Sequence, residues 1–231
     1  MSFGPELPAR RRRRRRMVAA TGVAGTALLG ASLSSEPGSA KFYGQTLAAA
    51  GVYAGGGVVS GPLRLVGDRG DVDGPRSPLG SALVAALIGV GAFGVFYACA
   101  LVCRHIPVLN RAIAGILSYA HRGSFAPVMI TTLATGVGEE LFFRGALYAA
   151  LGSRRPLASS TALYALSTTI TRNPALVLAS VVMGTLFAAQ RKITGGVQAP
   201  LISHLVWSAL MLRFLPPLFY PRDDLQPAQL A

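Results

Sequence analysis

The sequence is poor in charged residues, and especially in acids. Only 13% of its 231 residues are charged, and nine aspartates and glutamates stand against 22 lysines and arginines. By contrast, 52% of the residues are hydrophobic and the mean hydropathy is +0.48. This composition argues against an ordinary soluble domain and favours a polytopic membrane protein.

Cysteine is also scarce. The two cysteines, Cys99 and Cys103, stand four residues apart in "CALVC". This spacing places both on one face of a helix, where we expect them to pack as small apolar residues between helices. They carry no information on the redox compartment.

The hydrophobic windows predict an all-α membrane bundle with six or seven transmembrane helices. A helix needs about 20 apolar residues to cross the hydrocarbon core. Windows near that length predict spans at 17–34, 42–62, 80–103, 124–151, 157–170, 175–189 and 197–215. The fifth and sixth are short, which predicts tilted helices or helices shielded from lipid by their neighbours.

Seven consecutive arginines at 10–16 precede the first predicted span. A basic run can bind nucleic acid, but its place beside an apolar segment favours a cytoplasmic anchor on anionic lipid head groups. Alternation then puts the loop 64–76 and the basic pairs 154–155 and 191–192 on the same side, which supports seven spans. We therefore expect an integral protein of the plasma membrane with a cytoplasmic N-terminus and no nucleic-acid partner.

Two segments fit this orientation less simply. The loop 104–123 would lie outside although it carries three arginines, and "IPVLNRAIAGILSYAHR" predicts an interfacial amphipathic helix there. Residues 10–40 combine a basic run, an apolar run and the string "GSA", as a cleaved signal peptide does. The apolar part exceeds the usual core of a signal peptide and further spans follow, so we favour an uncleaved first helix.

Two adjacent carboxylates, Glu139 and Glu140, interrupt the fourth predicted span in "GVGEELFFRG", whereas the other acids fall in predicted tails and loops. An ionised side chain near mid-membrane costs at least ~2.5 kcal/mol and normally faces a protein interior or a water-filled cavity. Arg144 follows Glu140 by four residues, so an ion pair on one helical face explains Glu140. Glu139 projects to another face and needs a different partner, which makes it the better candidate for chemistry.

The last span supplies a polar partner in "PLISHLVWSALMLRF", where Ser208 follows His204 by four residues. A lone histidine on an apolar helix is more often a structural hydrogen-bonding residue. Together with the intramembrane Glu139, however, an imidazole can hold and deprotonate a water, with or without a metal ion.

These motifs resemble the CAAX prenyl protease and bacteriocin-processing family of intramembrane proteases, called CPBP or Abi. The family pattern is Glu-Glu-x-x-x-Arg on one helix, Phe-x-x-x-His on a second and His-x-x-x-Asn on a third. Glu139, Glu140 and Arg144 match the first motif, and "GTLFAAQRKITGGVQAPLISHLVWS" resembles the other two. The resemblance covers residues 124–214.

The second and third motifs depart from this pattern. Phe187 aligns with the phenylalanine of the second motif, but Arg191 stands where the family has histidine. In the third motif His204 is kept, whereas Ser208 replaces asparagine. One imidazole is therefore lost, and an amide becomes a hydroxyl.

The resemblance implies a membrane peptidase with a specific division of roles. Glu139 would be the general base, His204 would position the water or polarise the carbonyl, and Ser208 would donate a weaker oxyanion hydrogen bond. Glu140 and Arg144 would form the structural ion pair. The family's description as metalloendopeptidases points to a divalent metal such as zinc, but His204 with one carboxylate falls short of a full ligand set. We therefore favour a glutamate-activated water without metal.

Three functions of different classes remain open. The leading one is an intramembrane endopeptidase that cleaves a membrane-anchored peptide or protein near the cytoplasmic face. The second is a catalytically inactive family member that serves as a membrane interaction or immunity protein, and the third is an ion-coupled carrier with Glu139 as its proton site. The chain then divides into an arginine-rich cytoplasmic tail, N-terminal transmembrane helices, a protease-like core and a C-terminal tail, at 1–16, 17–123, 124–215 and 216–231.

Overall fold

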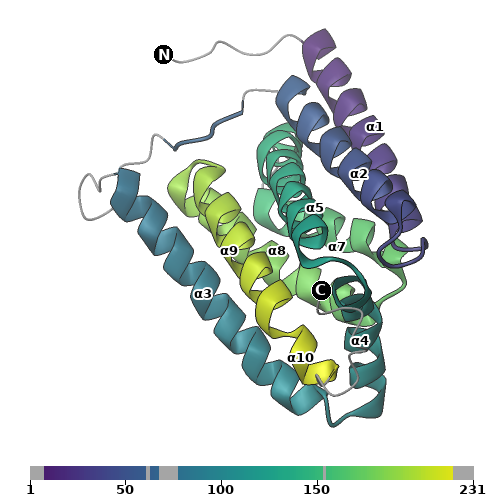
Figure 1. The fold of residues 1–231 in the computed structure, drawn as a ribbon. Helices are drawn as coiled ribbons and strands as arrows, with labels where there is room; N and C mark the ends of the chain where they lie inside the picture. The colour runs from purple at the N-terminus through teal and green to yellow at the C-terminus, as the bar shows by residue number, and fades with distance from the viewer. Residues whose placement is uncertain (1–7, 61–62, 68–77, 153–154, 221–231) are drawn as a thin grey trace.

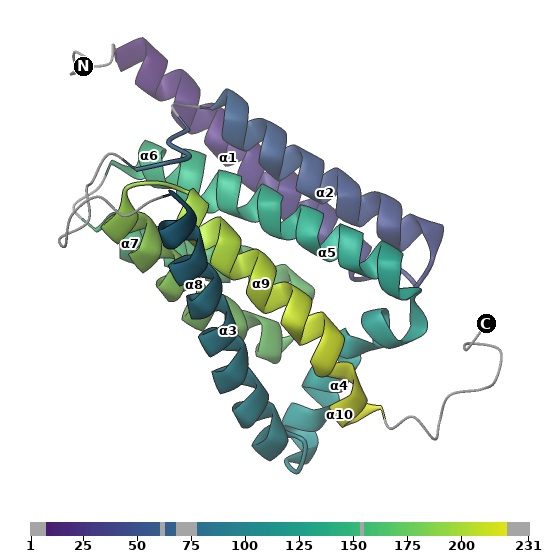
Figure 2. The ribbon, with the colours of Figure 1, turned by 60° about the vertical axis from the view of Figure 1, so that its left-hand side comes forward.

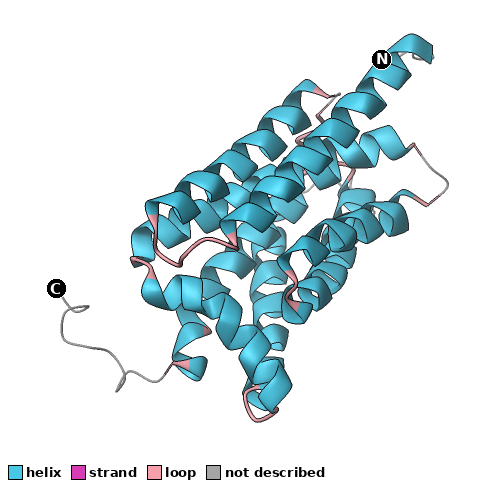
Figure 3. Cartoon of the chain, turned by 90° about the vertical axis from the view of Figure 1, so that its right-hand side faces the viewer, coloured by secondary structure: helices cyan, strands magenta, loops and turns pink. Residues whose placement is uncertain are grey.

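A computed structural model describes residues 8–60, 63–67, 78–152 and 155–220, and its regular structure is helical throughout these ranges (Figures 1 and 3). This confirms the predicted all-α class. The α-helices are α1 (Pro8–Ser32), α2 (Ala40–Val59), α3 (Pro78–Cys103), α4 (Pro107–Arg122), α5 (Phe125–Glu139), α6 (Tyr148–Leu151), α7 (Pro156–Thr168), α8 (Pro174–Thr194), α9 (Gln198–Phe214) and α10 (Pro216–Phe219). A π-helix, η1 (Glu140–Leu147), joins α5 to α6, and a short 3₁₀ helix, η2 (Thr169–Thr171), follows α7.

Each predicted span overlaps a helical segment, which for residues 124–151 consists of α5, η1 and α6 in succession. Residues 61–62 of the second predicted span lie outside the described part of the chain. Among the described residues, three helices are long and apolar enough to cross a membrane by themselves: Leu79–Cys103, Pro174–Thr194 and Gln198–Phe219. The others fall short for visible reasons, since α1 begins in the arginine run, α2 is rich in glycine, and α7 has only 13 residues. The molecule is thus an all-α membrane bundle, and the count of six or seven spans stays a prediction.

The arginine run is helical, whereas we expected a tail over residues 1–16. Residues 8–16 form the first turns of α1. Proline suits the first position of a helix and arginine is a good helix former, so nothing in this stretch interrupts the helix that the apolar segment continues. Residues 1–7 lie outside the described part of the chain, as do residues 221–231 of the expected C-terminal tail.

One end of the bundle, here called the arginine end, gathers the start of α1 with the ends of α6 and α8. Arg14 Nη2 donates to the carbonyl oxygen of Ala149 at 3.3 Å. The segment before α3 also reaches this end, where Val197 N donates to the carbonyl oxygen of Arg64 at 3.0 Å. Arg14 and Arg64, which we expected on the same side of the membrane, therefore both lie at the arginine end.

The opposite end, here called the α4 end, is built around α4, which forms where the amphipathic pattern predicted a helix (Figure 2). The Tyr119 hydroxyl donates to the carbonyl oxygens of Leu33 and Ser35 beyond α1, at 2.5 and 3.2 Å. Partial burial raises the pKa of Tyr119 above its ordinary value. Asn173 Nδ2 donates to the carbonyl oxygen of Ala112 at 2.7 Å, which ties the start of α8 to α4.

Close helix contacts position the segment that carries the glutamates. A Cβ atom on Gly138 of α5 would lie 2.5 Å from the carbonyl oxygen of Ala50 in α2, so only glycine allows this approach. On the other side of the bundle, α3 packs against α9 and is otherwise largely exposed. Cys99 lies exposed on α3, so the expectation that both cysteines pack between helices is wrong for Cys99.

Candidate active site

The two glutamates lie at a junction between two kinds of helix. Glu139 is the last residue of α5 and Glu140 is the first of η1. A π-helix bonds each N–H to the fifth residue back, is rare, and occurs mostly in short pieces at functional sites. Neighbouring helices bind two of its carbonyl oxygens: Ser160 Oγ donates to that of Phe143 at 2.9 Å, and Arg191 Nε to that of Arg144 at 2.9 Å.

Glu140 and Arg144 form a fully buried ion pair, as their spacing predicts. Both side chains are 0% exposed, and Arg144 Nη1 lies 3.1 Å from Glu140 Oε1, although the angle does not meet that of a hydrogen bond. Arg144 Nη2 donates to the carbonyl oxygen of Gly184 at 3.3 Å. Its guanidinium lies over the rings of Tyr164 and Phe187, at 4.6 and 5.3 Å from their centroids. Arg144 thereby connects η1 with α7 and α8.

The imidazole of His204 contacts Glu140, whereas the sequence analysis paired it with Glu139. His204 Nδ1 lies 2.9 Å from Glu140 Oε1. An ionised carboxylate only accepts hydrogen bonds, so we assign a proton to Nδ1. The ring of Phe187 stacks on the imidazole with 4.7 Å between centroids. Glu140 and Phe187 together fix the ring, and Nε2 lies toward α5, 3.7 Å from a Cβ placed on Gly136.

Glu139 has its own partner, which sequence reasoning missed. The Tyr164 hydroxyl of α7 donates to Glu139 Oε2 at 2.7 Å. Tyr164 stands in the apolar stretch "TALYALS". A buried tyrosine hydroxyl usually finds a hydrogen-bond partner, and this is the signal that could have identified it. The two adjacent glutamates therefore have different partners, as their projection from the helix predicts.

A cavity of about 320 Å³ brings the predicted catalytic residues together. Glu139, His204 and Ser208 line it, and they are 8%, 5% and 6% exposed. Tyr164 and Trp207 line it as well, and the buried indole Nε1 of Trp207 has no hydrogen-bond partner within the described part of the chain. Glu140 and Arg191 are absent from the lining. Glu139 is thus the glutamate that faces the cavity, whereas Glu140 supports the structure around it.

The cavity extends from these residues to the α4 end. Leu33, Tyr119 and Leu215 line its far part. Along α9 the distance from His204 to Leu215 is about 16 Å at 1.5 Å per residue. The cavity therefore leads away from the arginine end.

The cavity does not hold a full set of zinc ligands. No group of three or more histidines, cysteines, aspartates or glutamates lies close enough to hold a metal ion among the residues described. A catalytic zinc site takes three protein ligands and keeps one position for water. Glu139 and His204 supply two ligands, so the donor set at this cavity does not fit zinc.

The fold and the cavity define an all-α membrane protein with a buried glutamate pair, an imidazole and a hydroxyl brought together from three helices. Residues 121–210 match the family model described as Rce1-like, type II CAAX prenyl endopeptidase. This segment carries every residue of the candidate site, and the match confirms the resemblance to the CAAX protease family that the motifs indicated. Searches of curated proteins and of solved structures gave no match.

Proposed function

We propose that the protein is an intramembrane endopeptidase of the CAAX prenyl protease type, which hydrolyses a membrane-associated peptide with a water activated by Glu139. The observation that carries this proposal is the cavity shared by Glu139, His204 and Ser208. Tyr164 holds the Glu139 carboxylate, and Glu140 holds the His204 imidazole. The protein acts in the plasma membrane, with the arginine end on the cytoplasmic side near anionic lipid heads.

In this mechanism Glu139 is the general base. Tyr164 holds one carboxylate oxygen, which leaves the other to accept a proton from water. The oxygen of that water attacks the carbonyl carbon of the scissile amide and forms a tetrahedral intermediate with a negatively charged oxygen. The amide C–N bond then breaks, and the proton held by Glu139 passes to the leaving nitrogen, so that an acid and an amine are formed.

His204 and Ser208 act on the water and on the oxyanion. With Nδ1 bonded to Glu140, the imidazole presents Nε2 as a hydrogen-bond acceptor for the attacking water. His204 thereby positions the water, and Glu139 takes its proton. The Ser208 hydroxyl, one turn further along α9, donates to the developing oxyanion. The unpartnered indole N–H of Trp207 is a second donor at the same cavity.

The direction of the cavity favours substrate entry from the α4 end. The lining there comes from α4 and from the ends of α1 and α9. This differs from our expectation of cleavage near the side of the arginine run. A peptide bond would have to reach Glu139 through the part of the cavity lined by Leu33 and Tyr119.

The test is cleavage of membrane-anchored peptides in liposomes that contain the full chain. The panel includes a farnesylated peptide with a C-terminal CAAX sequence and non-prenylated peptides with a single membrane anchor. We expect Glu139→Gln to lower kcat/KM by about 10²–10⁴, the usual contribution of a general base. Glu36→Gln is the matched control, because Glu36 is exposed in the turn between α1 and α2 and lies outside the cavity. Cleavage by a folded Glu139→Gln protein at the wild-type rate would show that Glu139 is not the base.

One observation favours a second candidate, a catalytically inactive family member that acts as a membrane interaction or immunity protein. Within the described residues His204 is the one imidazole on the cavity, and Arg191, at the position assigned to the second motif, bonds to the backbone of η1 instead. This candidate predicts that the wild type cleaves no peptide of the panel. It also predicts that any cellular phenotype of the protein survives Glu139→Gln.

A further inference from the structure

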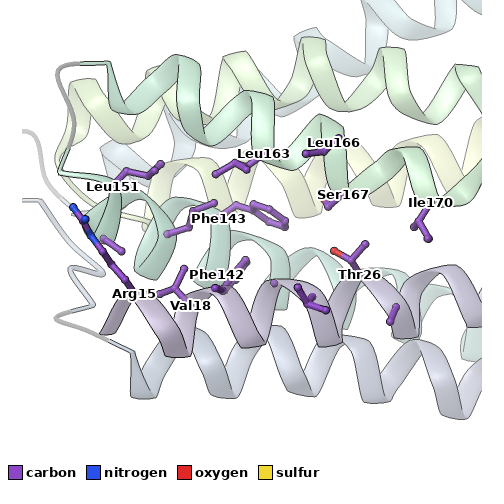
Figure 4. Close-up of a pocket in the computed structure, with 16 residues that line it drawn as sticks. Arg15, Val18, Thr26, Phe142, Phe143, Leu151, Leu163, Leu166, Ser167 and Ile170 are labelled. Atoms are coloured by element: carbon purple, nitrogen blue, oxygen red, sulfur yellow. The ribbon is translucent and has the colours of Figure 1, made fainter. Parts of the chain in front are cut away.

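A second, larger hollow shares no lining residue with the cavity of Glu139. It measures about 840 Å³ and separates α1 from α7 (Figure 4). Its floor is formed by Phe142 and Phe143 of η1, both 2% exposed, and its α7 wall carries Leu163 and Leu166, which are 39% and 64% exposed. We call it the α1–α7 groove. Apart from one arginine and two hydroxyl-bearing side chains, its lining is apolar.

The groove exists because α1 is held by α2 rather than by α7. The hydroxyls of Thr26 and Tyr53 lie 3.1 Å apart, and a Cβ atom on Gly25 would lie 2.4 Å from the Tyr53 ring, so α1 is in direct contact with α2. α1 approaches the α7 side closely at its far end, where a Cβ atom on Gly30 would lie 2.6 Å from Ile170 Cγ1. One side of the groove is therefore formed by α1, which packs on α2, and the groove narrows toward Ile170.

The charged residue of the groove lies at the arginine end. Figure 4 shows the guanidinium of Arg15 beside Leu151, with Thr26 and Ile170 toward the other end. From Arg15 to Ala27 the groove follows α1 for about 18 Å at 1.5 Å per residue. One leaflet of the hydrocarbon core is about 15 Å thick, which is half of about 30 Å. The groove thus runs from the level of lipid head groups through roughly one leaflet.

We propose that the α1–α7 groove is a binding site for one anionic phospholipid, with its phosphate on Arg15 and an acyl chain along Phe142 and Phe143. A lipid in its ordinary bilayer orientation has its head at the arginine end and its chain parallel to α1. The surrounding lipid tails are as apolar as the groove, so hydrophobic transfer gives no preference for any lipid. The preference comes from the positive charge of Arg15 at the mouth of the groove, which selects an anionic head group.

The competing occupants are the helix of a second copy and the lipid group of a lipidated substrate. The charge favours a phospholipid over both, because neither an apolar helix nor an uncharged chain carries a negative charge that would pair with Arg15 at the mouth. The proposal does not rest on peptidase activity, so its test uses no cleavage assay.

The test counts the lipids that stay bound to the full chain. The protein is reconstituted in nanodiscs of phosphatidylcholine with one fifth phosphatidylglycerol, extracted in mild detergent, and examined by native mass spectrometry. We expect one retained phospholipid per chain, with a ratio of phosphatidylglycerol to phosphatidylcholine about fivefold above the 1:4 ratio in the nanodisc, the preference given by one basic residue at the surface. Equal retention of the two lipids in proportion to their supply would overturn the proposal.

Two matched pairs of variants locate the site. Ala19→Phe fills the groove, whereas Ala20→Phe makes the same change at an exposed neighbour outside it. Arg15→Gln removes the charge at the mouth, whereas Arg16→Gln removes an equal charge from an exposed arginine outside the lining. We expect lipid retention to be lost in Ala19→Phe and selectivity to be lost in Arg15→Gln, with both controls within twofold of the wild type.

Two results would refute the assignment. If Ala19→Phe and Ala20→Phe retain the lipid equally, it binds elsewhere on the arginine-rich surface. If the wild type is a dimer that Ala19→Phe alone converts to a monomer, the groove holds a second copy of the chain.

Discussion

The buried ion pair between Glu140 and Arg144 allows a prediction that separates the two adjacent glutamates. Glu140→Gln removes the counter-ion of a guanidinium that is 0% exposed and leaves it one carbonyl acceptor and two aromatic faces. Breaking a buried pair on one side costs about 3–5 kcal/mol. Glu139→Gln keeps a carbonyl oxygen that can accept from Tyr164, so its cost is about 1 kcal/mol.

The difference in stability is therefore about 2–4 kcal/mol. For a chain of this size each kcal/mol corresponds to about 2–4 °C in Tm, so Glu140→Gln should unfold about 4–16 °C below Glu139→Gln. The assay is thermal unfolding of the purified variants in one detergent, followed by circular dichroism at a fixed heating rate. Activity does not enter this comparison, so it holds for a peptidase and for an inactive family member alike.

A third protein tests the cause of the loss. Glu140→Gln combined with Arg144→Met removes both charges and keeps a long side chain beside Tyr164 and Phe187. Replacement of a buried pair by apolar groups is often neutral, so we expect the double variant to recover at least half of the loss in Tm. If the single Glu140→Gln protein is as stable as Glu139→Gln, Arg144 does not depend on Glu140 and the reasoning is wrong.

Three further predictions concern neighbouring residues. Tyr164→Phe should lower the rate of peptide cleavage while the protein stays folded, because Glu139 loses the hydrogen bond that orients it; an unchanged kcat/KM would refute that role. Gly138→Val should lower Tm by several degrees through a clash with the Ala50 carbonyl oxygen, whereas equal stability would mean that α2 and α5 can separate at little cost. Arg191→His should leave cleavage no faster than in the wild type, because this side chain lies outside the cavity, and a gain in rate would show that it reaches the reacting water.

The sequence predicted the helices well because their signal is local. Apolar windows and basic flanks depend on a single stretch of chain, and each predicted span overlaps a helical segment. The errors lie where the adjoining segments of the chain determine the local conformation. The arginines at 10–16 continue α1 because no helix breaker separates them from it, and the unbroken span predicted over residues 124–151 contains a π-helix that no sequence pattern marked.

The site was predictable in its members and less so in its contacts. The adjacency of Glu139 and Glu140 already required different partners for them, and Arg144 follows from spacing alone. The attachment of His204 to Glu140 does not follow from spacing, because it depends on how α9 is placed against η1. Tyr164 was missed because α7 carries no charged residue that would draw attention to it, and because its contact with Glu139 depends on how α7 is placed against α5.

The junction between α5 and η1 explains how two adjacent carboxylates carry out different tasks. Adjacent residues in an α-helix are about 100° apart, which turns one glutamate toward the cavity and the other toward the protein interior. The interior glutamate contacts Arg144 and His204. Two carbonyl oxygens of the π-helix that begins at this glutamate accept hydrogen bonds from Ser160 of α7 and Arg191 of α8. Arg191 is thereby explained without any role at the cavity: it ties α8 to the π-helix. The same contacts that fix the geometry around Glu139 also make its surroundings costly to change, which is why the strongest effects on stability are expected at Glu140 and the strongest effects on chemistry at Glu139.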